Sequence, residues 1–253
     1  MIFGMTSPSA EYFDQWYADM AVSPTHQDVA IQTLGLPPEL ESTSLLSWDG
    51  IADVTDALGV GPDDVLVDLA CGRGGYGLEI ARRTGAELIG VDFSQVAIER
   101  ARQKAPRRAE FRVGDLTATG LPDAAAAAVV CIDAMHFAEP HAAGVAESRR
   151  VLQPGGRLVL TGWQALDLDD EVVPERLRRA IGAALHDAGF VEVAVTDMPA
   201  WRAAELAHWQ AAVALDPSGD PALESLRDEG ERILSRLDHT RRVLAVGRVP
   251  NSP

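Results

Sequence analysis

Cysteine and long hydrophobic stretches are scarce in this sequence. Its two cysteines, Cys71 and Cys131, are too few for a disulfide framework, and their spacing suits neither a zinc site nor a redox pair. No apolar run approaches the length that crosses a bilayer. The first fourteen residues lack the basic segment, apolar stretch and cleavage site of a secretory signal. We therefore expect a soluble, cytoplasmic protein without membrane contacts.

Positive charge is also in short supply. The chain has 22 Lys and Arg residues against 38 Asp and Glu residues, which gives a formal net charge of -16. Binding to a nucleic-acid backbone needs clustered basic side chains that displace counterions, so this balance argues against nucleic-acid ligands. A small-molecule ligand is expected instead, and 253 residues suffice for one domain with a substantial core.

From residue 65 onward, short apolar segments alternate with stretches of helical periodicity. This alternation predicts a doubly wound α/β fold, in which a parallel sheet carries helices on both faces. The expected strands are residues 65–70, 87–91, 109–114, 127–132, 157–163, 191–198 and 242–249. The expected helices between them are residues 76–83, 95–104, 139–152, 174–188, 201–215 and 221–237.

Helical segments also precede the sheet and interrupt its end. Residues 11–20, a segment from residue 26, and residues 45–58 have helical spacing, which predicts an N-terminal helical cap over residues 1–60. The core is expected over residues 61–253. Two helices separate the last two strands, a connection too long for an ordinary loop. We interpret residues 200–238 as a lid over the site.

A glycine-rich turn follows the first strand. Gly72, Gly74 and Gly77 match the G-x-G-x-x-G fingerprint of dinucleotide-binding folds, and Asp92 lies about twenty residues further on. Glycines allow the backbone to approach a ligand closely, and the following helix offers free N–H groups. By this motif alone, NAD remains an open alternative.

Carboxylates at the ends of three successive strands favour a different ligand. Asp68, Asp92 and Asp115 are expected on the carboxyl edge of the sheet, where open α/β folds bind ligands. Asp68 precedes the first glycine by four residues, and its negative charge suits an ammonium or sulfonium group better than a pyrophosphate. The alternative is that each carboxylate only caps a helix or stabilises a turn.

Four motifs in order resemble the class I S-adenosylmethionine-dependent methyltransferases. They are DLACGRG at residues 68–74, GVDFS at 90–94, the segment from VGDL to AMHF at 113–137, and VLQPGGRLVLTGW at 151–163. The resemblance implies a seven-stranded sheet of order 3-2-1-4-5-7-6 with the last strand antiparallel. It also implies S-adenosylmethionine as cofactor, with S-adenosylhomocysteine as its product.

The same resemblance assigns roles along the cofactor. Asp68 is expected near the methionine amino group, Asp92 at the ribose hydroxyls and Asp115 at the adenine amino group. Ala70 stands where the family commonly has glycine, a change of one methyl group. The full expected cofactor set is Tyr17, Asp68, Ala70, Gly72, Gly74, Asp92, Phe93, Asp115, Leu116 and Asp133.

The acceptor side is expected on the same edge of the sheet. His136 follows the fourth strand and is the candidate base for the acceptor's proton, with His141 as second choice. Trp16 and Trp209 are interpreted as packing residues, and the acidic loop 167–171 as solvated, so no metal is expected. The expected substrate residues are Tyr12, Met135, His136, Trp163 and Trp201.

These features predict an enzyme that methylates an oxygen, nitrogen or carbon atom of a small molecule in secondary metabolism. The alternative is an enzyme of the same fold that catalyses a cyclisation or rearrangement while the cofactor does not react, because fold alone does not decide the reaction. The expected assembly is a monomer or a homodimer.

Overall fold

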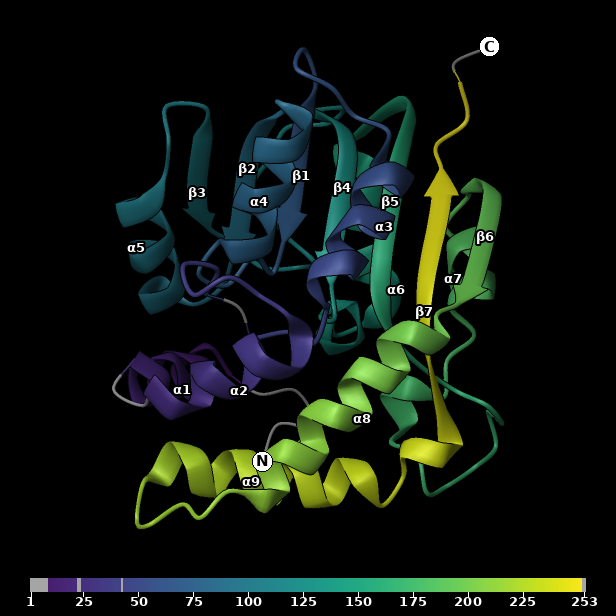
Figure 1. Cartoon of the computed structure of the whole chain (residues 1–253). Coiled ribbons are helices and arrows are strands. Elements are labelled where there is room, and N and C mark those ends of the chain that lie inside the picture. The colour runs from purple at the N-terminus through teal and green to yellow at the C-terminus, as the bar shows by residue number, and fades with distance from the viewer. Residues whose placement is uncertain (1–8, 22–23, 42, 252–253) are drawn as a thin grey trace.

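The computed structural model describes residues 9–21, 24–41 and 43–251, and these residues form a seven-stranded sheet (Figure 1). Residues 1–8, part of the stretch in which a secretory signal was sought, lie outside them. The strand order β3-β2-β1-β4-β5-β7-β6 confirms the predicted order. The strands are β1 (Val65–Leu69), β2 (Glu87–Asp92), β3 (Ala109–Val113), β4 (Ala126–Ile132), β5 (Leu152–Ala165), β6 (Val191–Asp197) and β7 (Thr240–Arg248).

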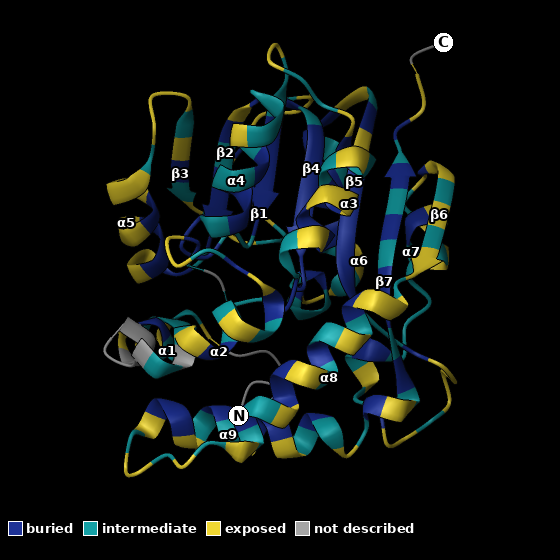
Figure 2. Cartoon of the chain, in the orientation of Figure 1, coloured by how far each residue is buried: buried dark blue, intermediate teal, exposed yellow. Residues whose placement is uncertain are grey.

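Strands β1 to β5 run parallel, whereas β7 pairs antiparallel with both β5 and β6. The predicted antiparallel last strand is thereby confirmed. The central strands β1 and β4 are buried almost throughout (Figure 2), as expected for parallel strands covered on both faces. The carboxyl ends of β1 to β5 therefore lie along one edge of the sheet.

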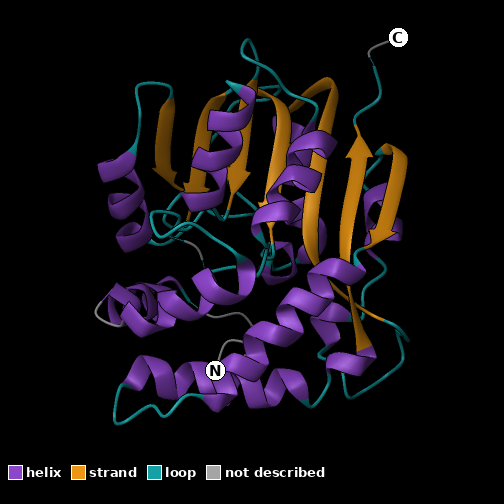
Figure 3. Cartoon of the chain, viewed as in Figure 1, coloured by secondary structure: helices purple, strands orange, loops and turns teal. Residues whose placement is uncertain are grey.

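Helices cover both faces of the sheet and its carboxyl edge (Figure 3). Leu66 of β1 belongs to the core under α3, α4 and α5, whereas its neighbour Val67 belongs to the core under α6 and α7, because successive strand residues face opposite ways. The helices are α1 (Ala10–Ala21), α2 (Pro24–Leu34), α3 (Trp48–Leu58), α4 (Gly75–Thr84), α5 (Gln95–Lys104), α6 (His141–Val151), α7 (Ile181–Asp187), α8 (Pro199–Ala214) and α9 (Pro221–Leu234).

Side-chain caps mark where several helices begin. The hydroxyl of Ser47 accepts from the N–H of Gly50 ahead of α3, and Ser94 caps α5 in the same way. Asp220 accepts two backbone N–H groups at the start of α9, where Pro221 occupies the first helical position. Such caps satisfy N–H groups that have no partner within the helix.

The predicted helix over residues 174–188 is wrong in part. A short 3₁₀ turn, η3 (Glu175–Leu177), is followed by a break, and α7 begins only at Ile181. Val173 and Leu177 are buried in a small apolar cluster with Ala165 at the end of β5. Because these side chains are buried against Ala165, the chain is interrupted between η3 and α7 and does not form one continuous helix.

The helices α1, α2, α8 and α9 form a layer below the carboxyl edge of the sheet (Figure 1). Within this layer α2 packs on α8, α8 on α9, and α1 on α9, so the N-terminal helices and the predicted lid are in direct contact. By contrast α3, predicted as part of the cap, packs against α4, β4 and β5 on the face of the sheet. No helix within the described ranges is long and apolar enough to cross a membrane.

Candidate active site

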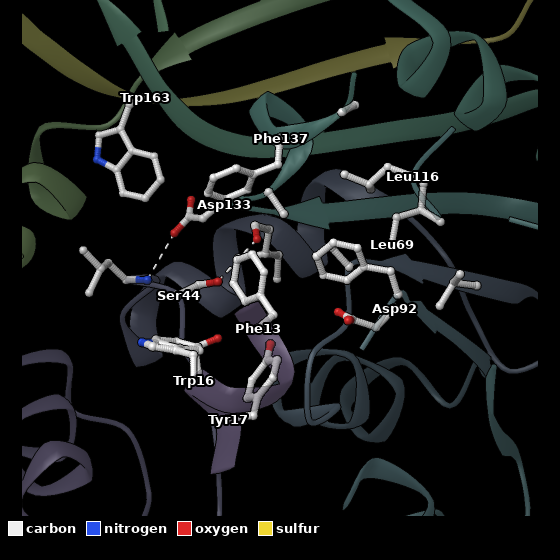
Figure 4. Close-up of a pocket in the computed structure, with 18 of the residues that line it drawn as sticks. Phe13, Trp16, Tyr17, Ser44, Leu69, Asp92, Leu116, Asp133, Phe137 and Trp163 are labelled. Atoms are coloured by element: carbon white, nitrogen blue, oxygen red, sulfur yellow. Dashed lines mark hydrogen bonds between the residues drawn. The ribbon is translucent and has the colours of Figure 1, made fainter. Parts of the chain in front are cut away.

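A cavity of about 170 Å³ lies between the carboxyl edge of the sheet and the helical layer (Figure 4). We call it the site cavity. Asp92 and Asp133 reach it from the ends of β2 and β4, and Phe13 and Tyr17 reach it from α1. The site cavity thus occupies the position where open α/β folds bind their ligands.

The glycine turn has the backbone geometry that its sequence predicts. Gly72 adopts a φ of 52°, and the Tyr17 hydroxyl oxygen lies 2.7 Å from where a Cβ at residue 72 would stand. A side chain there would meet both a strained backbone and the tyrosine. Ala70 also has a positive φ, 55°, which costs a residue with a Cβ about 1 kcal/mol. Ala70 is therefore tolerated at the cost of some strain in the turn.

Asp68 and Asp92 flank this turn and are both buried. Burial, with the nearby charge of Asp92, raises the pKa of Asp68 to about 8. Burial also raises the pKa of Asp92 to about 6, although the N–H groups of Gly72 and Ser94 donate to it at 2.8 and 2.9 Å. Asp68 lines a smaller cavity of about 20 Å³ that shares Ala70 with the site cavity.

The residues predicted to lie near the adenine of the cofactor also line the site cavity. Asp115, Leu116 and Phe93 line it, and one oxygen of Asp115 accepts the N–H and hydroxyl of Thr117 at 2.8 and 2.6 Å. Phe93 packs on Phe13 of α1, with ring centroids 5.3 Å apart. The helix α1 therefore closes over the end of β2.

A buried ion pair holds Asp133 at the end of β4. Arg242 of β7, with no exposed surface, donates to both carboxylate oxygens at 2.9 and 3.0 Å. The Thr161 hydroxyl donates at 2.7 Å, and the Leu45 N–H donates at 3.1 Å. Asp133 has a positive φ of 56°, and these four contacts offset the strain. This carboxylate, expected to bind cofactor, ties β4, β5, β7 and the segment before α3 together.

Trp163 stands beside this pair at the end of β5. The Arg242 guanidinium lies 4.2 Å from the centroid of its ring. Its indole N–H donates to both oxygens of Glu205, at 2.8 and 2.9 Å, and Trp209 donates to the same carboxylate at 3.3 Å. Trp163 lines the site cavity, and its predicted role as a substrate residue stays a prediction; Glu205 links it to α8.

His136, the predicted base, does not line the site cavity. Its ring lies behind Phe137 and Trp163, at centroid distances of 4.1 and 5.8 Å. Burial, with the positive charge of Arg176 nearby, lowers the pKa of His136 well below its usual range. The imidazole is therefore neutral near neutral pH, and its role as base stays a prediction.

Other predicted residues also stand behind the cavity walls. Tyr12 packs edge to face on Phe13, with ring centroids 5.7 Å apart. Trp201 is 1% exposed, and its indole N–H donates to Asp53 of α3 at 3.0 Å. The residues predicted to bind cofactor or substrate that do not line the site cavity are Tyr12, Asp68, Gly72, Gly74, Met135, His136 and Trp201, of which Asp68 and Gly72 line the smaller cavity.

The helices α8 and α9 of the predicted lid contribute cavity residues that were not predicted from the sequence. His208 of α8 and Glu229 of α9 line the site cavity, as do Trp16 and Trp209, which were interpreted as packing residues. Trp209 has both roles, since it is also buried in the core. In the sequence these positions show only as a histidine and a glutamate on otherwise apolar helix faces, and that pattern alone does not identify a binding site.

The comparisons with known proteins agree with this geometry. Residues 66–156 match the family model described as a methyltransferase domain. The demethylmenaquinone methyltransferase of Deinococcus radiodurans is 38% identical over 113 residues, covering 43% of this chain and 46% of that protein. The sterol 24-C-methyltransferase of Eremothecium gossypii is 30% identical over 134 residues, covering 51% and 36%.

Residues 66–156 are therefore similar to a methyltransferase domain, and the strand order of the sheet is the one that the resemblance to class I methyltransferases implied. The chain spans less than half the length of the curated relatives named here. Among solved structures, the [4+2]-cyclase SpnF has a TM-score of 0.75 at 20% identity and covers 97% of this chain and 98% of its own. The Haemonchus contortus phosphoethanolamine N-methyltransferase 2 has a TM-score of 0.76 at 17% identity, covering 96% and 61%. At these identities the likeness shows the fold.

The buried ion pair predicts how far the fold loses stability when one partner is removed. Asp133→Ala leaves the Arg242 charge buried without its partner, so the free energy of unfolding should fall by about 3–5 kcal/mol. The control is Glu192→Ala, which removes the exposed ion pair of Glu192 with Arg248 and should cost less than about 1 kcal/mol. Chemical denaturation measures both, and equal losses would contradict this account of Asp133.

The raised pKa of Asp68 predicts a pH-dependent stability. Between about pH 4 and pH 8 the folded protein keeps a proton on Asp68 that the unfolded chain has lost, so this group lowers stability as pH rises. The free energy of unfolding of Asp68→Asn, minus that of the wild type, should therefore increase from pH 5 to pH 8. The exposed Asp56→Asn serves as control, and thermal denaturation across this range is the measurement. A difference independent of pH would refute the assignment.

Proposed function

We propose that this chain binds S-adenosylmethionine in the site cavity and the adjoining smaller cavity, and transfers its methyl group to a small molecule. The observation that carries the proposal is the pair of buried carboxylates, Asp68 and Asp92, on either side of the glycine turn. The curated relatives named above are methyltransferases whose printed names refer to a quinone and a sterol. Both names support a small molecule as acceptor.

The residues present fit this cofactor. Each oxygen of Asp92 accepts one backbone N–H and keeps a lone pair for a hydroxyl group, as a ribose would offer. Asp68 is a buried carboxylate whose charge is disfavoured, and an ammonium group beside it would restore the charged form. A pyrophosphate at this place would add negative charge to two buried carboxylates. These two carboxylates therefore support S-adenosylmethionine over NAD as the ligand.

When bound, S-adenosylmethionine supplies an electrophilic methyl group on a positively charged sulfur. The protein's contribution is to hold the acceptor in line and to keep water out, and α1 does the latter through Phe13 and Tyr17. Asp14 fixes α1 in place, because its carboxylate accepts from the Ser94 hydroxyl and from the Val96 N–H. Residues 1–60 were predicted as a cap on the core of residues 61–253; because α3 packs on the sheet, we propose that α1 and α2 act as the cap and residues 200–238 as a lid.

Cyclisation is the second candidate, and one finding favours it. The likeness to the [4+2]-cyclase extends over nearly the full length of both chains, so its helical layer as well as its sheet corresponds to this one. In that case the site would hold the cofactor while an apolar substrate rearranges beside it. The apolar and aromatic walls around Phe137 and Trp163 serve either reaction.

Cofactor binding is the first test. In titration calorimetry, S-adenosylmethionine and S-adenosylhomocysteine should bind, and NAD should not. Asp92→Asn removes the charged acceptor of two hydroxyl hydrogen bonds and should weaken cofactor binding about tenfold to a hundredfold, whereas the exposed Asp56→Asn should not change it. Binding of NAD alone would overturn the proposal.

Turnover separates the two candidate reactions. If methyl transfer is the activity, S-adenosylhomocysteine forms in a one-to-one ratio with product, because each transfer leaves one demethylated cofactor. Chromatography with mass detection of both compounds gives that ratio. Product that accumulates while S-adenosylmethionine stays constant would favour the cyclase alternative.

A further inference from the structure

The smaller cavity beside the glycine turn is lined by charged groups of both signs. Asp68 lines it from the end of β1, Glu41 from the segment before α3, and Arg73 from within the turn. The other side chains of its lining that carry a polar atom are uncharged: Thr43, Ser44, Cys71 and Tyr76. Among the described residues around this cavity, Arg73 is therefore the one cation.

Arg73 is a buried charge whose donors are only partly used. It is 8% exposed, and although burial lowers its pKa, a guanidinium stays protonated near neutral pH. Within the described part of the chain it forms an ion pair with Glu41, with 3.3 Å between Nη1 and Oε2, and its guanidinium lies 5.9 Å from the centroid of the Tyr17 ring. Its Nε has no hydrogen-bond partner among the described residues. Donors of this kind gain from an acceptor that a ligand supplies.

Glu41 neutralises Arg73 only in part, because two further cations share its carboxylate. Nζ of Lys104 lies 2.7 Å from Oε1 of Glu41, and Nε of Arg100 lies 3.4 Å from Oε2. Three positive charges therefore surround one negative charge. The side chains of Lys104 and Arg100 are 32% and 46% exposed, so solvent screens them, whereas Arg73 is buried. A second carboxylate beside Arg73 would meet a positive charge that is not yet balanced.

An amino-acid group carries an ammonium and a carboxylate on the same carbon atom, and the smaller cavity offers a partner for each. The family resemblance assigned Asp68 to the ammonium group and no residue to the carboxylate. We propose that Arg73 binds the carboxylate of the cofactor's amino-acid end, so that the smaller cavity is a subsite for a zwitterion. This inference rests on the proposed function. Arg73 was not predicted as a site residue from the sequence.

An analogue without the carboxylate tests the proposal in the unmodified chain. Titration calorimetry at about pH 7 compares S-adenosylhomocysteine with 5′-deoxy-5′-(3-aminopropylthio)adenosine, which keeps the amine and lacks only the carboxylate. The analogue should bind about tenfold to a hundredfold more weakly, because charge-assisted hydrogen bonds to Arg73 are lost. Equal affinities overturn the proposal. If S-adenosylhomocysteine does not bind at all, the proposed function itself is refuted and this inference falls with it.

The variant Arg73→Gln assigns the effect to this side chain. It should weaken binding of S-adenosylhomocysteine about tenfold to a hundredfold, whereas the aminopropyl analogue should keep its wild-type affinity within about twofold, since it has no carboxylate to lose. The control is Arg82→Gln, which removes an exposed arginine of α4 and should change neither affinity. Equal weakening of both ligands by Arg73→Gln would show that Arg73 only supports the turn, and would contradict the proposal.

Two further ligands separate charge recognition from a change of fold. 5′-Methylthioadenosine lacks the whole amino-acid group, so its affinity should be the same for the wild type and Arg73→Gln. 5′-Deoxy-5′-(3-carboxypropylthio)adenosine keeps the carboxylate and lacks the amine, so Arg73→Gln should weaken its binding about tenfold while Asp68→Asn should not weaken it. If Arg73→Gln weakens 5′-methylthioadenosine as much as S-adenosylhomocysteine, Arg73 does not act through the carboxylate.

Discussion

The ion pair between Asp133 and Arg242 is the interaction on which the rest of the site depends. It joins the end of β4 to β7, residues separated by 109 positions in the chain, and it adds Thr161 of β5 and the Leu45 N–H to the same carboxylate. A buried pair of charges adds little net stability compared with apolar packing, but losing one partner is costly. Its effect is therefore to fix one arrangement of β7 relative to β4, in which the Arg242 guanidinium also lies 4.2 Å from the centroid of the Trp163 ring.

The situation differs for Asp68 and Asp92, the two buried carboxylates that flank the glycine turn. Burial raises the pKa of Asp68 to about 8 and that of Asp92 to about 6, and a nearby carboxylate adds to each shift, Asp92 at Asp68 and Asp14 at Asp92. Backbone N–H groups offset the cost at Asp92, whereas Asp68 relies on the N–H of Gly77. A cationic ligand would favour the charged form of these buried carboxylates, because it places a positive charge next to them.

Local signals made the sheet and the strand-end carboxylates predictable. The strands β1 to β4 were recognisable from short apolar runs, and Asp68, Asp92 and Asp115 follow from their places at strand ends. The order of β6 and β7 came from the family resemblance, because periodicity carries no information about which strands pair. The break between η3 and α7 depends on Val173 and Leu177 meeting Ala165, a tertiary contact that helix propensity does not contain.

The acceptor side was harder to predict because it is built from contacts between distant segments. Nothing near His208 in the sequence reveals that the Thr33 hydroxyl, 175 residues away, lies 3.0 Å from Nδ1 of its ring, and His136 was the natural choice because it follows a strand. Residues 200–238, the predicted lid, are one insertion between β6 and β7, held by Glu205 at Trp163 and by Trp201 at Asp53. His208 and Glu229 lie on that insertion and line the site cavity, so substitutions there would alter one wall of the cavity without touching Asp68 or Asp92 at the ends of β1 and β2.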